Sequence, residues 1–242
     1  MSQSWNIRSR AAFELVVGYA LILCVIWTPN PSQRILFWLS FVFIISTTLA
    51  SRRNYDDELG FGFQRIRGGL WIIAATVAGC LVALGIAEAT HLLHPLFGPK
   101  PLPLHVWGYL VWALLQQFIL QDFFLLRLLR ITHNPASAVL AAGLLFGAAH
   151  IPNPVLTVAT LLWGTAACFI FLRYRSLYVL AIAHWMLGLC IAVTVPNALN
   201  HHMRVGLGYI RYHAQPEALN PHARLSLTDK SGSKGRELQA AR

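Results

Sequence analysis

Two adjacent glutamines, Gln116 and Gln117, lie in the middle of an apolar segment long enough to cross a membrane, and Gln121 and Asp122 follow them. Hydrocarbon strongly disfavours an amide or carboxyl group that has no hydrogen-bond partner. Such side chains are therefore expected to face the protein interior, and a polar cluster at bilayer depth is a candidate functional site. A neutral amide cannot accept a proton at any useful pH, so the glutamines are candidate hydrogen-bonding groups and not bases.

Two histidines lie on other apolar segments. His150 closes one of them in the run FGAAHIPNP, and His184 lies midway along the last one in LYVLAIAHWMLGL. A single intramembrane histidine is often a packing residue, but two on separate segments, with an amide pair on a third, favour a site. Neutral imidazole can act as a base or bind a metal ion.

The composition indicates which elements position these residues. The chain has 242 residues, of which 56% are hydrophobic and 12% charged, with a mean hydropathy of +0.55. We predict an all-α, polytopic membrane helical bundle, because a helix needs about 20 apolar residues to cross the hydrocarbon. About seven segments are candidates, at 11–28, 35–50, 70–89, 104–128, 137–151, 155–174 and 177–197.

The net charge of +10 is better explained by membrane topology than by nucleic acid, since no soluble region is long enough to carry a groove-reading module. We therefore expect membrane lipids and no nucleic acid as partners. Cys24, Cys80, Cys168 and Cys190 lie singly within apolar runs, which is typical of buried thiols. Neither a disulfide framework nor a thiolate metal site is expected.

At these residues the chain resembles the CAAX-processing and bacteriocin-processing (Abi, or CPBP) family of intramembrane proteases. That family carries EExxxR on one helix, FxxxH on the next and HxxxN on a later one. Here QQFILQ (116–121) stands at the first motif, Phe146 to His150 match the second, and His184 to Gly188 stand at the third. The resemblance covers about 58–197 and begins at Glu58-Leu59-Gly60-Phe61.

The resemblance implies a CAAX-protease-like fold and a division of the chain into three parts. These are N-terminal transmembrane helices with a cytoplasmic loop at 1–57, the membrane domain at 58–213, and a disordered basic tail at 214–242. It also implies an activity. In the family, the glutamate pair is held to activate a water for attack on a peptide bond near a lipid-modified or membrane-embedded site, and the histidines bind and polarise the reacting groups.

Four polar positions of the family pattern differ in this chain: Gln116 and Gln117 replace glutamates, Gln121 replaces arginine, and Gly188 replaces asparagine. Two functions therefore stay open. One is a hydrolase that acts on lipidated or membrane-embedded peptides with His150, His184 and an unidentified base. The other is a non-proteolytic homologue that binds a membrane substrate or partner, or catalyses another reaction such as acyl transfer, through the same cavity. The sequence names no cofactor and leaves a metal open.

Secondary candidates surround this set. Asp122 is the nearest carboxylate, but a regular helix turns it about 140° from Gln117, so pairing with Arg127 or capping is the ordinary interpretation. Glu88, His91 and His94 lack a clear fourth ligand and form only a weak metal-site pattern. After the last segment, His201, His202 and Arg204 form either an interfacial belt or a polar cover over the cavity mouth.

The topology can be tested. Ten arginines flank segment ends on one side, and the short loops of the other side hold only Arg34 and Lys100. By the positive-inside rule the N-terminus and the 51–69 loop are cytoplasmic. Seven spans would then place the basic tail outside, so either there are fewer spans or the stretch after Pro196 folds back.

We expect an impermeant thiol reagent, applied from outside, to label a cysteine at position 34 and to leave one at position 53 unlabelled until the membrane is permeabilised. Labelling of position 53 in intact cells would overturn this orientation.

Overall fold

The part of the chain that the structure describes is helical, with no strand in residues 2–55, 59–94, 102–132 and 134–212 of this computed structural model. This confirms the all-α prediction. The predicted tail at 214–242 lies outside the described residues, as do Asp56, Asp57 and Glu58. In chain order the helices are α1 (Ser2–Trp27), α2 (Ser32–Tyr55), η1 (Phe63–Arg65), α3 (Ile66–Ala89), α4 (Leu102–Phe118), η2 (Ile119–Leu125), α5 (Leu126–Ile131), α6 (Pro135–Ala148), α7 (Pro154–Tyr174), α8 (Leu177–Thr194), α9 (Asn197–Asn200) and α10 (Gly206–Ile210).

Among the residues that the structure describes, six helical stretches are long and apolar enough to cross a membrane, and a seventh, α6, is apolar but has 14 residues. These correspond to the seven predicted segments and make the chain a multi-pass membrane protein.

One predicted helix boundary was wrong. We expected His150 to close a helix, but α6 ends at Ala148, and His150 lies in the turn before α7. Asn153 caps α7 by accepting a hydrogen bond from the Leu156 amide, and Pro154 occupies its first turn, as expected at a helix start.

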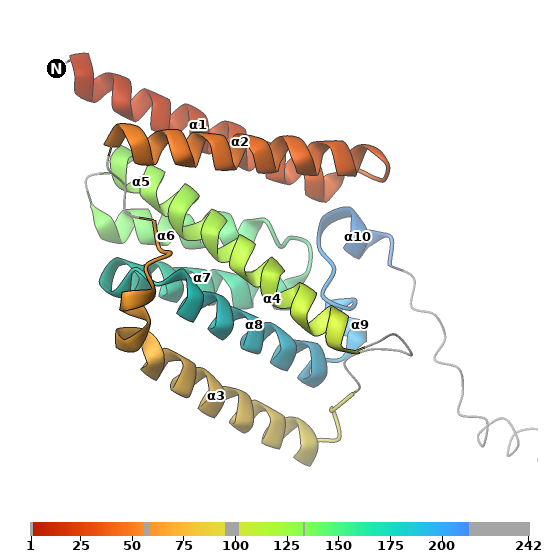
Figure 1. The fold of residues 1–242 in the computed structure, drawn as a ribbon. Coiled ribbons are helices and arrows are strands. Elements are labelled where there is room, and N and C mark those ends of the chain that lie inside the picture. The colour runs from red at the N-terminus through yellow and green to blue at the C-terminus, as the bar shows by residue number, and fades with distance from the viewer. Residues whose placement is uncertain (1, 56–58, 95–101, 133, 213–242) are drawn as a thin grey trace, which may run out of the picture. The chain divides into compact units, whose positions relative to one another are not determined.

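The continuous rod formed by α4, η2 and α5 is the central element of the bundle. It packs against α1, α2, α6, α7 and α8. Figure 1 shows α1 and α2 side by side along one edge and α3 along the other, where α3 packs mainly on α8. In the most apolar stretch of the rod 56% of residues are buried, against at most 39% in any other long span. The outer helices therefore present their apolar side chains to lipid, and the rod carries the polar row.

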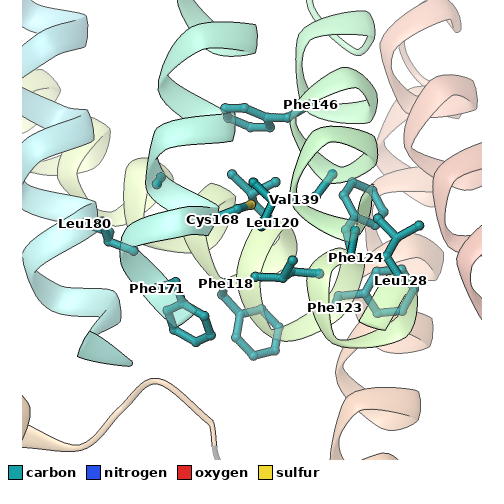
Figure 2. Packing of buried hydrophobic residues seen from close by; sticks show 14 of the residues in the cluster. Phe118, Leu120, Phe123, Phe124, Leu128, Val139, Phe146, Cys168, Phe171 and Leu180 are labelled. Carbon is teal, nitrogen blue, oxygen red and sulfur yellow. The ribbon is translucent and has the colours of Figure 1, made fainter. Parts of the chain in front are cut away.

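Aromatic and aliphatic side chains of the rod form the main hydrophobic core. Phe118, Leu120, Phe123 and Phe124 are buried among residues of α6, α7 and α8. Figure 2 shows Phe123, Phe124 and Leu128 on one side of this cluster, and Phe118 with Phe171 on another. Phe146 belongs to the same cluster, so the core extends from the rod to the turn that carries His150.

The rod contains a π-helical turn over Ile119–Leu125, where the sequence predicted a regular α-helix. Turns of this kind often occur at functional sites. Inside it, both carboxylate oxygens of Asp122 accept from the Gly60 amide, at 3.2 and 3.3 Å, and the Gly60 carbonyl accepts from the Leu177 amide at 2.8 Å. Asp122 thus caps the segment that leads into η1. Arg127 reaches the Asp122 backbone carbonyl.

A buried ion pair joins α1 to α5. The Arg127 guanidinium donates to Glu14 Oε2 from Nε at 3.0 Å, lies 2.9 Å from it through a second nitrogen, and stacks over the Phe123 ring at 3.9 Å. Arg10 adds a bond of 2.8 Å to Glu14 Oε1. Because the Arg127 side chain is fully buried, the Glu14 carboxylate is needed to stabilise its positive charge.

The stretch after Pro196 folds back onto the bundle. The buried amide of Asn153 donates to the carbonyls of Asn200 and Arg204 at 2.7 and 3.0 Å, and the Gly206 amide donates to Ile151 at 3.1 Å. This places α9 and α10 over the α6–α7 turn, at the end of the bundle opposite the start of α1 (Figure 1).

We expect Glu14→Gln to destabilise the protein by about 3–5 kcal/mol, because it leaves the Arg127 charge buried without a carboxylate. The double variant Glu14→Leu/Arg127→Met should recover most of this loss, since both charges are then absent. Thermal unfolding in detergent measures both effects. If the single and the double variant lose the same amount of unfolding free energy, the unpaired charge of Arg127 is not the cause of the loss.

Candidate functional site

A chain of hydrogen bonds joins the polar row of the rod to α8. Gln121 Nε2 donates to Gln117 Oε1 at 3.2 Å, and Gln117 Nε2 lies 3.0 Å from His184 Nδ1. An amide nitrogen can only donate, so His184 Nδ1 is the acceptor and the proton of the neutral ring is on Nε2. Gln117 and Gln121 are fully buried, and His184 is buried as well. The predicted row therefore does face the interior.

His150 has the opposite tautomer. Its Nδ1 lies 2.7 Å from the Phe146 carbonyl oxygen, and because a carbonyl only accepts, Nδ1 carries the proton and Nε2 has a lone pair. The Phe146 ring touches both histidines edge-on, with centroid distances of 5.0 Å to His150 and 5.8 Å to His184. Phe146 therefore separates a proton-accepting imidazole from a proton-donating one.

Two cavities hold different members of the predicted set. A first cavity of about 140 Å³ has His150, Gln116 and Phe146 in a wall that is otherwise almost entirely apolar and comes mainly from α1, α2 and α4. A second cavity of about 360 Å³ between α7 and α8 is lined by His184 and Gly188. Gln117 lines neither of these two. The Phe146 ring contacts both histidines.

The secondary candidate residues lie in different parts of the bundle. Asp122 caps Gly60 near the start of α3, and Gln121 supports Gln117 within the rod. His201 stacks on Tyr209 at a centroid distance of 3.9 Å. The turn that holds His201, His202 and Arg204 does reach the cavities, but through Val205 at the first and Met203 at the second. The described walls contain none of its three polar side chains.

Sequence reasoning missed Tyr109. A Cβ added at Gly188 would collide with the Tyr109 hydroxyl and ring, so this phenol occupies the space of any side chain at position 188. That position is where the resemblance expects asparagine. The Tyr109 hydroxyl of α4 therefore lies against α8 at Gly188, one turn after His184. Tyr109 precedes Gln116 by seven residues, two helical turns on the same face, and this spacing was the available signal.

The described residues fit a metal ion poorly. They contain no group of three or more His, Cys, Asp or Glu side chains placed to hold one. Glu88, His91 and His94 are therefore not arranged as a metal site. His150 and His184 each have an Nε2 atom, but the one on His184 carries the proton. Catalytic zinc sites usually have three protein ligands, so we derive no step through a metal.

The central part of this chain matches a known protein family. Residues 98–190 match the family model described as type II CAAX prenyl endopeptidase Rce1-like. The chain resembles this family over that range, which is about two fifths of its length. The matched range runs from before α4 into α8 and holds Gln116, Gln117, His150, His184 and the Tyr109–Gly188 pair. No curated protein matches this CAAX-protease-like chain, and no solved structure does.

The Tyr109–Gly188 packing predicts a reciprocal effect on stability. Gly188→Ala should destabilise this CAAX-protease-like protein by about 1–3 kcal/mol through overpacking. In the Tyr109→Leu background the same substitution should cost much less, and a double-mutant cycle in thermal unfolding measures the difference.

Gly108→Ala is the matched control, because an added Cβ there meets nothing within 4 Å. The interpretation of Tyr109 would be wrong if the cost of Gly188→Ala were the same with and without the phenol.

Proposed function

We propose that this CAAX-protease-like membrane protein binds a lipidated or membrane-embedded peptide in the first cavity, and that it lacks the carboxylate-dependent proteolysis of its family. The observation that carries the proposal is the hydrogen-bond chain from Gln121 through Gln117 to His184. At a position where the family has a base, this chain has a neutral amide whose oxygen and nitrogen are both engaged.

The amide also sets the protonation of the histidine. A carboxylate at position 117 would accept from His184 Nδ1–H and leave Nε2 with a lone pair. Gln117 donates to Nδ1 instead, so Nε2 holds the proton and His184 can only donate through it. The exchange of glutamate for glutamine thus removes a base and also reverses the role of the imidazole beside it.

The positions of the remaining carboxylates support the same proposal. Those within the described residues are Glu14, Glu88 and Asp122. Glu14 binds Arg127 and Arg10, and Asp122 caps Gly60. Neither cavity wall contains any of the three. The described part of the chain thus offers no carboxylate to activate a water beside His150.

The first cavity suits binding. Its apolar wall can accept a hydrocarbon chain or apolar side chains, which favours a hydrophobic ligand. Gln116 and His150 add an amide, which both donates and accepts, and a hydrogen-bond acceptor at Nε2. Together they match the N–H and C=O groups of one peptide unit. Hydrogen bonds of this kind would orient a peptide that the apolar wall holds.

One observation favours a second function, histidine-dependent hydrolysis or acyl transfer. The lone pair on His150 Nε2 can take the proton of a water or hydroxyl group as its oxygen attacks a carbonyl carbon. The proton would then pass to the leaving group as the scissile bond breaks. The buried Phe146 carbonyl holds the ring in the tautomer that this reaction requires.

The two functions differ in their response to the same variants. We expect the purified protein in detergent to bind a prenylated peptide without cleaving it, and Gln116→Leu to weaken binding by about tenfold, the cost of one or two hydrogen bonds. His150→Ala should also weaken binding. Fluorescence anisotropy of a labelled peptide measures affinity, and mass spectrometry of the same sample detects cleavage.

His91→Asn serves as the control, because His91 is a histidine outside both cavities whose positive φ of 55° asparagine tolerates. Cleavage that disappears in His150→Ala and persists in the control would contradict the binding proposal and support the second function. Absence of binding in every variant would contradict both.

A further inference from the structure

The second cavity, between α7 and α8, has one free hydrogen-bond donor in an apolar wall. His184 lines this cavity and is only 6% exposed. Its Nδ1 accepts from Gln117, so the proton-bearing Nε2 is the polar atom that the ring can offer to a ligand. This N–H group has no hydrogen-bond partner among the residues that the structure describes. An occupant that supplies an acceptor would therefore be bound in a defined position.

The other polar groups of the wall are engaged or covered. The Thr160 hydroxyl donates to the Leu156 carbonyl at 2.6 Å. Trp163 Nε1 is itself buried, so the indole contributes carbon atoms to the wall. No charged side chain belongs to the wall in the described part of the chain. A buried water molecule typically makes about three hydrogen bonds, and this wall offers it one, so the cavity suits a largely apolar ligand better than water.

The cavity is elongated and reaches the lipid-facing surface. Its α7 residues run from Leu156 to Ala166, which corresponds to about 15 Å of helix. Leu162 belongs to the wall and is 66% exposed, so a ligand can enter from the bilayer. His184 lies about 10 Å along the helix from Leu177, where α8 begins. The donor is therefore well below the membrane surface.

These features restrict the chemistry of the ligand. It must accept a hydrogen bond without bringing a charge or a donor that the wall leaves unpaired. A fatty acid fits poorly because its carboxylate is charged, and an alcohol because its own hydrogen also needs an acceptor. A phospholipid fits poorly because its ester groups adjoin a head group that stays at the membrane surface. A carbonyl group on a molecule that is otherwise apolar meets every requirement.

We propose that the second cavity binds an isoprenoid quinone, with one ring carbonyl accepting from His184 Nε2 and the tail lying along α7. A quinone is neutral, has acceptors and no donor, and dissolves in hydrocarbon. The Trp163 and His184 rings, whose centroids are 6.4 Å apart, offer aromatic surface to a flat conjugated ring. Both carbonyls of a quinone in the bilayer core lack partners, so the bond to His184 favours the bound state.

Gln117 determines the direction of this hydrogen bond. Its amide donates to Nδ1 and so leaves the proton of the neutral ring on Nε2. The site is separate from the first cavity, and it does not depend on whether the protein binds or cleaves a peptide there.

The test uses the full chain in detergent micelles with decylubiquinone as the probe. Infrared difference spectra measure its C=O stretching frequencies, and we expect one carbonyl band to move to lower frequency on binding, because a hydrogen bond weakens the C=O bond. Quenching of tryptophan fluorescence measures affinity. The chain has eight tryptophans, so the share of the quenching that is lost in Trp163→Phe reports on this cavity.

Two variants separate the donor from the space around it. His184→Phe keeps a ring but removes the donor, so the band shift should disappear and the affinity should fall by about tenfold. Ala159→Leu fills the cavity from α7 and should weaken binding by about tenfold or more. Ala75→Leu is the matched control, because Ala75 is an exposed residue of α3 outside both cavities, and it should change neither readout.

Four results would overturn the proposal: no binding of the quinone, binding with both carbonyl bands unshifted, affinity that is unchanged in Ala159→Leu, or equally tight binding of decyl octanoate. The last result would assign the cavity to apolar acyl esters, because decyl octanoate has a carbonyl but no ring. Circular dichroism shows whether each variant is folded. His184→Phe removes the partner of Gln117, and Ala159→Leu retains the test if that variant does not fold.

Discussion

Polar side chains in a helix surrounded by hydrocarbon must find their partners inside the protein, and this requirement organises the bundle. The rod of α4, η2 and α5 carries two glutamines, an aspartate and an arginine that are fully buried. Gln121 pairs with Gln117 within the rod, and the other three have partners on different elements: His184 on α8 for Gln117, Gly60 before η1 for Asp122, and Glu14 on α1 for Arg127. The polar contacts therefore determine which helices surround the rod, while apolar packing fills the space between them.

The same requirement explains how the buried amides are paired. Gln121 Nε2 donates to Gln117 Oε1, and Gln117 Nε2 donates to His184 Nδ1. One turn further along α8, the Tyr109 phenol takes the space beside Gly188. These polar groups are uncharged, so their burial avoids the large desolvation cost of an ionised group.

The motif residues lie close together but face different cavities. Phe146 in α6 and His150 in the turn after it are in contact, and Phe146 contacts His184 as well, so the three side chains form one cluster. Its two imidazoles nevertheless line different cavities, one toward α1 and α2 and the other between α7 and α8.

The sequence by itself determined the helical membrane fold, the order of the apolar segments and the interior position of Gln117, Gln121 and His184. It could do so because segment length and the cost of polar groups in hydrocarbon act locally along the chain. Only the tertiary structure decided three other features. The π-helical turn holds Asp122, whose partner Gly60 lies elsewhere in the chain, and local helical periodicity does not reveal such a partner. The separation of the cavities depends on how the Phe146 ring packs. The return of the chain after Pro196 depends on the hydrogen bonds of Asn153 to Asn200 and Arg204, because contacts between distant residues leave no period in the sequence.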